Sequence, residues 1–263
     1  MSYADETSIP NPFEAEELGW VFASPEHDEA LARMHFVIEG RQSCGILTGP
    51  PGSGKSRLFQ KLLGDIRRTG RQGALIDLSG LNAARLLVRL DAALGLNGGL
   101  PADSLSLWDA VMNGIGGLDM AGLELVLLLD HGQHAHPDVW PLLDQLLTQG
   151  THGLTILLAS PQPPTGLFAE FVRRHGALRI ELSRFSLPET ARFIRAAFER
   201  VGADGTPFDS DAVRRIHELT RGEPRLVSRL CRVAMLAATA DGATEIHASL
   251  VDAAAEEVLL VAT

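Results

Sequence analysis

The chain has 263 residues, of which 45% are hydrophobic and 21% charged, a composition typical of a globular protein with a buried core. It contains no apolar run close to the roughly 20 residues that cross a bilayer, and its acidic start does not resemble a secretory signal, so we expect a cytoplasmic protein. The formal net charge of −10 argues against general attraction to nucleic acid, although a local arginine patch remains compatible with phosphate contacts.

The two cysteines, Cys44 and Cys231, are far apart in sequence and have no neighbouring ligand residues. This spacing supports neither a disulfide framework nor a zinc site. Both are therefore expected to act as small buried hydrophobic residues.

The first helix is predicted to begin directly after Ser24. Ser24 is a typical N-cap, Pro25 suits the first helical position, and acidic residues follow in the first turn. Met34 and Ile38 then recur at helical spacing. The residues before this helix are predicted to be irregular and acidic.

Beyond this helix, short apolar segments alternate with helical patterns. Such alternation predicts an α/β fold in which helices cover both faces of a parallel sheet. The predicted strands are Cys44–Thr48, Ala74–Leu78, Leu125–Leu129, Thr155–Ala159 and Leu178–Leu182. The predicted helices between them are Lys55–Arg68, Asn82–Leu94, Leu105–Ile115, Pro137–Leu147 and Gly166–His175, with a Gly- and Pro-rich loop at Gly95–Asp103.

Strand patterns end near Ser186, and only helices are predicted beyond this point. These helices are Pro188–Val201, Ser210–Thr220, Pro224–Ala240 and His247–Val258. The change predicts an irregular acidic segment at 1–23, an α/β domain at 24–186 and a small helical domain at 187–263.

The segment between the first predicted strand and the next helix reads Gly49-Pro50-Pro51-Gly52-Ser53-Gly54-Lys55-Ser56 and matches the pattern G-x-x-x-x-G-K-[ST]. Glycines let the backbone N–H groups of such a loop approach phosphate oxygens, and the helix start adds its positive dipole end. Lys55 is expected to reach the β- and γ-phosphates, and the Ser56 hydroxyl to ligate Mg²⁺. The segment therefore predicts a P-loop that binds ATP and Mg²⁺, with Arg57 also placed among the nucleotide-binding residues.

A second element of this site is predicted at Glu124-Leu-Val-Leu-Leu-Leu-Asp130, a buried strand that ends in an acid. An aspartate in this position beside a P-loop can reach the Mg²⁺ coordination shell. We therefore expect Asp130 to be a magnesium ligand. The simpler alternative is an ordinary strand that ends in a turn-forming aspartate.

These two elements, followed by a helical domain, resemble the AAA+ ATPases, and in particular the branch that contains general secretion pathway protein A (ExeA-like ATPases) and the transposition ATPases TniB and MuB. The resemblance starts at Asn11-Pro12-Phe13 and covers nearly the whole chain. It implies that the segment Ser24-Pro25-Glu26-His27-Asp28-Glu29-Ala30-Leu31 forms the adenine side of the site, with Phe22 and His27 as candidate contacts. It also implies that Gly222-Glu223-Pro224-Arg225 is a sensor-2 motif whose Arg225 reaches the nucleotide phosphates.

The resemblance implies further site residues after the fourth strand. Ser160 or Gln162 occupies the place of the polar sensor-1 residue, which positions the attacking water. Arg173 and Arg174 lie where AAA+ proteins often carry an arginine finger, which completes the site of a neighbouring subunit. A solvated arginine pair is the alternative. The family also implies a homo-oligomer with ATP between subunits, and a protein partner that the sequence does not identify.

One departure from the family concerns hydrolysis. The family usually has D-E-A-Q where this chain has Asp130-His131-Gly132-Gln133, so the glutamate that activates water is missing. His131 is a candidate general base in its place; the alternative is a protein that binds ATP but hydrolyses it slowly or not at all. His131, His134 and His136 with Asp138 also suggest a metal site, but their spacing matches no established zinc pattern.

These patterns and the resemblance suggest four functions. The leading hypothesis is an AAA+ ATPase that couples ATP binding and hydrolysis to oligomerisation and partner binding. The second is a nucleotide-gated adaptor with little hydrolysis, which the residue at position 131 favours. The third is a DNA-associated transposition-type ATPase, which the acidic charge disfavours. A secretion-associated ATPase is a fourth hypothesis, which is disfavoured because this sequence lacks the transmembrane and cell-wall-binding parts of the full-length secretion protein.

Overall fold

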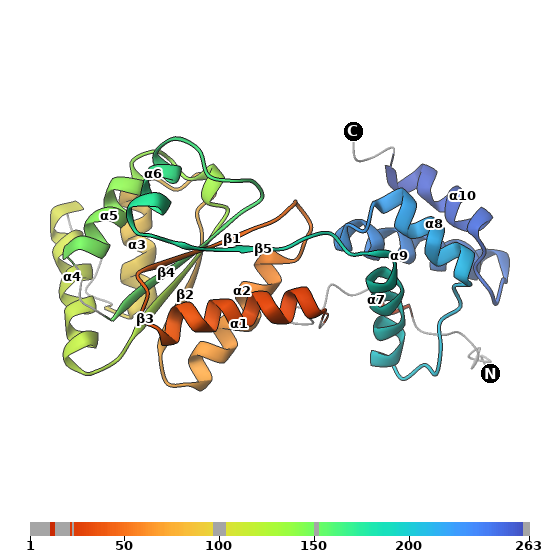
Figure 1. Cartoon of the computed structure of the whole chain (residues 1–263), viewed down its shortest axis with the longest axis horizontal. Helices are drawn as coiled ribbons and strands as arrows, with labels where there is room; N and C mark the ends of the chain where they lie inside the picture. Colours follow the sequence, from red (N-terminus) through yellow and green to blue (C-terminus); the bar gives the residue numbers. More distant parts are fainter. Residues whose placement is uncertain (1–10, 14–21, 23, 97–103, 150–152, 260–263) are drawn as a thin grey trace, which may run out of the picture. The chain divides into compact units, whose positions relative to one another are not determined.

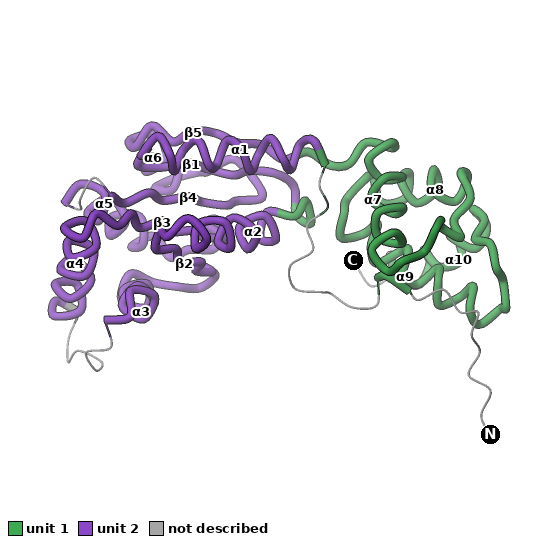
Figure 2. Tube along the Cα trace, turned by 90° about the horizontal axis from the view of Figure 1, so that it is seen from below, with its two compact units in different colours: residues 1–24, 51–54, 183–263 green, residues 25–50, 55–182 purple. Residues whose placement is uncertain are grey.

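The computed structural model describes residues 11–13, 22, 24–96, 104–149 and 153–259 (Figure 1). The chain divides into two compact units (Figure 2). The sheet unit comprises residues 25–50 and 55–182, and the helical unit comprises residues 1–24, 51–54 and 183–263. Most of the predicted loop at 95–103 and of the irregular start lies outside the described residues.

The sheet unit is built on five parallel strands in the order β2-β3-β4-β1-β5. The strands are β1 (Cys44–Thr48), β2 (Gln72–Asp77), β3 (Leu125–Asp130), β4 (Leu154–Ser160) and β5 (Leu178–Glu181). All residues of β3 and β4 are buried, as expected for strands that are covered on both faces. The predicted parallel α/β sheet is confirmed.

Helices cover both faces of this sheet. Helices α1 (Pro25–Glu39) and α2 (Lys55–Arg68) pack on one face, while α3 (Ala83–Leu94), α4 (Ser104–Met120), α5 (Val139–Gln149) and α6 (Gly166–Arg174) lie on the other. Alternate strand residues such as Ile46, Leu127 and Ile156 join the core on the α3–α6 side. The opposite face is closely packed, because a Cβ on Gly45 would lie 3.3 Å from Val37 of α1.

Helix α4 is longer than the predicted helix, which ended at Ile115. Gly114, Gly116 and Gly117 weaken the helical pattern there, since glycine costs about 1 kcal/mol relative to alanine in a helix interior. The helix continues because Leu118 packs against the core of the sheet unit. Tertiary packing thus outweighs local propensity in this segment.

The helical unit contains α7 (Leu187–Arg200), α8 (Ser210–Thr220), α9 (Pro224–Asp241) and α10 (Ala248–Leu259). Helix α7 begins with a capping box, in which Ser186 N and Oγ donate to Glu189 Oε2 at 2.9 and 2.8 Å. An isolated parallel bridge between Phe208 and Ile246 joins the segments that precede α8 and α10. Among the described helices of both units, none is long and apolar enough to cross a membrane.

Both cysteines are buried, as predicted, with Cys44 in β1 and Cys231 in α9. Burial raises the pKa of the Cys44 thiol to about 12, and it also raises the pKa of Cys231. Both thiols are therefore protonated near neutral pH and serve as core residues rather than nucleophiles.

The described part of the N-terminal segment, Asn11–Phe13, packs within the helical unit. Phe13 is 7% exposed, and its ring meets that of Phe198 edge-on at a centroid distance of 5.9 Å. Arg200 donates to the Pro12 carbonyl at 3.0 Å, and Asn11 Nδ2 donates to the Arg232 carbonyl at 3.3 Å. A segment that the sequence pattern assigns to an irregular start therefore contributes to the core of the last domain.

Phe13→Ala is expected to lower the free energy of unfolding by about 3 kcal/mol, the low end for truncating a buried phenylalanine. The matched control is Phe36→Ala, because Phe36 is 60% exposed on α1 and should cost little. Urea unfolding followed by circular dichroism measures both. Equal effects of the two substitutions would show that Phe13 is not an anchor of the helical unit.

Candidate functional site

The candidate site lies where the parallel strands of the sheet unit end. Because the strands are parallel, their carboxyl ends share one edge, where α/β proteins commonly bind ligands. Thr48 of β1 pairs in register with Ser160 of β4, and Asp77 of β2 pairs with Asp130 of β3. The P-loop follows Thr48 directly, so the loop begins at the same edge of the sheet as the other three polar strand ends.

Lys55 is held across the P-loop by the loop's own backbone. It is the first residue of α2 and is 9% exposed, and its Nζ donates to the Gly49 carbonyl at 2.6 Å and the Pro50 carbonyl at 2.9 Å. Gly52 and Gly54 have φ values of 75° and 96°, in the left-handed region that glycine adopts without strain. Such a loop, followed by a helix N-terminus, directs N–H groups and positive charge toward a bound anion.

Gly52 and Glu223 both belong to the helical unit and lie against each other. A Cβ on Gly52 would lie 2.5 Å from Glu223 Oε1, so this position has no room for a side chain. Glu223 is the N-cap of α9, and Arg225 is exposed on the first turn of that helix. The preceding Gly222, with φ 69°, is equally restricted, because its Cβ would lie 2.0 Å from the Phe185 carbonyl oxygen.

Asp130 and Ser56 offer the oxygen atoms that a magnesium ion requires. Asp130 is 6% exposed at the end of β3, and its Oδ1 accepts a hydrogen bond from His131 N at 2.8 Å. Ser56 is exposed on the first turn of α2. Carboxylate and hydroxyl oxygens are ligands that suit Mg²⁺, so these residues fit the ion that a P-loop nucleotide carries.

His131 adopts a left-handed conformation with φ 55°, which is uncommon for a residue other than glycine. Its ring Nδ1 lies 3.1 Å from Asp77 Oδ1. Partial burial by itself raises the pKa of Asp77, but hydrogen bonds from Ser79 and His131 outweigh it and hold that pKa below its ordinary value. In the tautomer whose Nδ1–H donates a hydrogen bond to the Asp77 carboxylate, the ring carries its lone pair on Nε2.

Asp77 is a site residue that the sequence analysis missed. Its signal was an acid at the end of the second predicted strand, at a position equivalent to that of Asp130 in the third. The strand order β2-β3, which brings the two ends together, is not encoded in any local pattern.

The other histidines after β3 do not gather into a metal site. His136 Nδ1 lies 2.8 Å from Asp138 Oδ1, and Asp138 also accepts a hydrogen bond from Ala83 N at the start of α3. In the described part of the chain, none of these residues belongs to a group of three potential metal ligands. The structure therefore gives no support to the alternative of a metal site here.

Ser160 and Gln162 line a pocket at the same edge of the sheet. Ser160 is 1% exposed, and its Oγ donates to the Gln162 carbonyl at 2.8 Å. The pocket has a volume of about 360 Å³ and lies between the segments that follow β3 and β4. Trp140 and Phe168 line its apolar side and stack with centroids 4.2 Å apart. The side chain of Gln162 is exposed.

The two arginines at the end of α6 differ in their contacts. Arg174 Nη1 donates to Asp144 Oδ2 of α5 at 2.5 Å, and His175 Nε2 lies 2.8 Å from the other oxygen of that carboxylate. Arg173 is exposed and forms no ion pair with any residue that the structure describes. Arg174 is therefore anchored, whereas Arg173 is solvated. The sequence alone could not distinguish the two.

The structure places the two residues suggested for the adenine side in different units. Phe22 belongs to the helical unit, where its ring meets Phe185 and Phe193 edge-on at 5.5 Å. His27 is buried on α1 of the sheet unit. Contact of either residue with a nucleotide stays a prediction, as does the sensor role of Arg225.

Comparisons with known proteins show what the chain is similar to. Residues 38–163 match the family model of the AAA domain. The chain is 27% identical to general secretion pathway protein A of Aeromonas hydrophila over 256 residues, which are 95% of this chain and 46% of that protein. The chain thus spans less than half the length of this relative.

Three solved structures share the fold. Cdc6p from Pyrobaculum aerophilum has a TM-score of 0.74 and 15% identity, over 94% of this chain and 70% of that one. The Drosophila ORC bound to DNA has a TM-score of 0.70 and 14% identity, over 97% and 68% of the two chains. The RuvB Holliday junction branch migration motor of Thermotoga maritima has a TM-score of 0.60 and 17% identity, over 87% and 68%.

The sheet order, the P-loop sequence and the match of residues 38–163 to the AAA domain model make this chain similar to the AAA+ P-loop proteins. Within this class, the sequence resembles general secretion pathway protein A.

Proposed function

We propose that this chain binds Mg²⁺-ATP at its P-loop and hydrolyses it, and that the nucleotide controls its assembly with further copies of itself. The observation that carries the proposal is the position of Lys55. Its ammonium group is held by the backbone of the P-loop, at the edge of the sheet where β3 ends in Asp130. Lys55 and the loop N–H groups would hold the β- and γ-phosphates. Ser56 and Asp130 would hold Mg²⁺, which offsets the charge of the phosphates.

His131 is the proposed group that accepts the proton of the attacking water. Asp77 fixes the ring through Nδ1, which leaves Nε2 as the acceptor. Ser160 and Gln162, at the end of the neighbouring strand, are the proposed residues that orient this water. In this arrangement an aspartate–histidine pair takes the place of the glutamate that the family usually carries.

A second candidate function is a nucleotide-gated switch with little turnover. It is favoured by one observation, namely that the P-loop and Asp130 match the family pattern whereas position 131 departs from it. In such a protein ATP would be a structural ligand, and binding alone would change the assembly state.

The exposed Arg173, rather than the anchored Arg174, is the proposed residue that completes the site of a neighbouring copy. Arg173→Ala should therefore lower the rate of phosphate release by about a thousandfold, the low end for loss of an arginine finger. Arg174→Ala removes the same charge but only breaks the pair with Asp144, so it should change the rate by less than about threefold.

A mixing experiment makes this test specific for action between subunits. In mixed assemblies of Arg173→Ala and Lys55→Ala chains, the intact P-loop of the first faces the intact Arg173 of the second. Mixing two inactive variants should restore part of the activity, in proportion to the assembled fraction seen by sedimentation. Equal loss in both arginine variants, or no recovery on mixing, would contradict the assignment.

A DNA-associated function has no specific support in this chain. One of the similar solved structures is ORC bound to DNA, and another is the RuvB Holliday junction branch migration motor. Their identities of 14% and 17% to this chain show a common fold alone. The net charge of −10 disfavours a polyanionic partner.

A further inference from the structure

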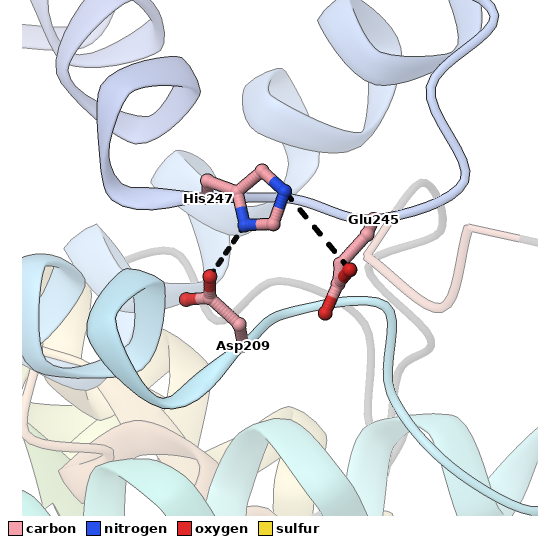
Figure 3. A group of neighbouring side chains, drawn as sticks. All are labelled: Asp209, Glu245 and His247. Carbon is pink, nitrogen blue, oxygen red and sulfur yellow. Dashed lines mark hydrogen bonds and ion pairs between the residues drawn. The ribbon is translucent and has the colours of Figure 1, made fainter.

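Three side chains with metal-ligating atoms gather in the helical unit, outside the nucleotide site. They are Asp209, Glu245 and His247, and their ligand atoms all lie within 4.8 Å of one another (Figure 3). His247 Nδ1 lies 2.5 Å from Asp209 Oδ2, and His247 Nε2 lies 4.0 Å from Glu245 Oε2. The ring thus stands between two carboxylates, as Figure 3 shows.

The backbone, and not only the attraction between these side chains, brings the cluster together. Ile246 N donates to the Pro207 carbonyl at 2.8 Å, and Asp209 N donates to the Ile246 carbonyl at 3.2 Å. Ile246 is fully buried. Because side chains alternate along an extended segment, its two neighbours Glu245 and His247 both point away from the core. The bridge therefore presents both ligands beside Asp209.

The helices that follow also fix two of the three residues. Asp209 caps α8, since its Oδ1 accepts a hydrogen bond from Ala212 N at 2.6 Å. The His247 carbonyl accepts from Leu250 N and Val251 N at 3.1 and 3.2 Å in the first turn of α10. The ligand positions are thus held by structure that does not depend on an ion.

The charges of the group suit a cation. Asp209 is one carboxylate of the group and is half-buried. Glu245 is a second carboxylate and is exposed. Two carboxylates with one imidazole form a ligand set that a divalent ion neutralises.

We propose that Asp209, Glu245 and His247 form a binding site for a divalent transition-metal ion of the Zn²⁺ type. Imidazole with carboxylates suits zinc and its neighbours, whereas Ca²⁺ and Mg²⁺ prefer oxygen ligands alone. Bond lengths of about 2.1 Å in a tetrahedral site separate ligand atoms by about 3.4 Å. With one ligand atom taken from each residue, the three atoms lie within 4.8 Å of one another, so side-chain movements of about 1–2 Å bring them to this separation.

Such an ion has three protein ligands and leaves its remaining position to water. It joins the segments that begin α8 and α10, so its binding stabilises the helical unit by mass action. The site is independent of the proposed ATP site, since none of its ligands belongs to the P-loop or to the ends of the sheet strands.

The test is a calorimetric titration of the full, EDTA-treated and dialysed chain with Zn²⁺ alone, in buffer with excess Mg²⁺ that occupies the oxygen-only sites. We expect one site with a micromolar or lower Kd, and a higher midpoint of thermal unfolding with Zn²⁺ present. Co²⁺ in place of Zn²⁺ should give the visible absorption bands of a low-coordinate site.

Three variants should each weaken Zn²⁺ binding at least tenfold: His247→Ala, Glu245→Gln and Asp209→Asn. Asp209→Asn is the most specific, because asparagine is as good an N-cap as aspartate and keeps α8 intact. His136→Ala is the matched control, since His136 forms an exposed pair with Asp138 at 2.8 Å that has no third ligand among the residues the structure describes. Binding that His136→Ala weakens and Asp209→Asn leaves unchanged would overturn the proposal, as would the absence of binding at micromolar Zn²⁺.

Discussion

Lys55→Ala is expected to lower the affinity for Mg²⁺-ATP at least about a hundredfold. Each hydrogen bond from a charged group contributes about 1.5–3 kcal/mol to binding. A loss of about 1.4 kcal/mol lowers the affinity tenfold. The substitution removes the ammonium group that the Gly49 and Pro50 carbonyls hold across the loop. Isothermal titration calorimetry with Mg²⁺-ATP measures the loss directly.

Lys61→Ala is the matched control, because Lys61 is the only other lysine in the chain and lies on the same helix. It should change the affinity by less than about twofold, as expected for a surface charge away from the ligand. Circular dichroism verifies that both variants are folded. Unchanged affinity in Lys55→Ala, or an equal loss in both variants, would refute the phosphate site.

If the protein is the switch with little turnover, His131→Glu is expected to raise the rate of ATP hydrolysis by roughly tenfold or more, since a well-placed general base contributes about 10²–10⁴-fold. The substitution restores the residue that related ATPases carry directly after Asp130. Steady-state phosphate release at saturating ATP gives the rate. A variant that is no faster than wild type would show that position 131 does not limit hydrolysis.

Asp77→Asn and His131→Ala separate the two candidate functions at this position. If His131 accepts the proton, both substitutions should slow hydrolysis by about 10²-fold while leaving ATP affinity within twofold. If the protein is a switch with little turnover, both should leave the slow wild-type rate unchanged. Asparagine at position 77 keeps the size of the side chain but loses the charge that accepts from Nδ1.

Those parts of the fold that follow local patterns could be predicted from the sequence. The three inner strands β1, β3 and β4 are buried on both faces, so they read as short continuous apolar runs. Cys44–Thr48 was predicted with its observed bounds. The P-loop is a contiguous motif in which each residue type has a chemical reason. The helices Lys55–Arg68 and Ser210–Thr220 were likewise predicted with their observed bounds.

Features that depend on strand order or on distant contacts could not be predicted. The bond between Asp77 and His131 joins residues 54 positions apart and requires β2 to lie beside β3. Arg173 and Arg174 look equivalent in the sequence, and only the position of Asp144 on another helix distinguishes them. Asp209 and His247 are 38 positions apart and meet only because a single bridge joins their segments.

The most direct test of the account is steady-state phosphate release from ATP and Mg²⁺ by the purified chain over a wide range of protein concentration, with Lys55→Ala as the blank. The account predicts release above the blank, at a rate per chain that rises with concentration as assembled sites form. Release no faster than that of the blank at every concentration would contradict the assignment as an ATPase.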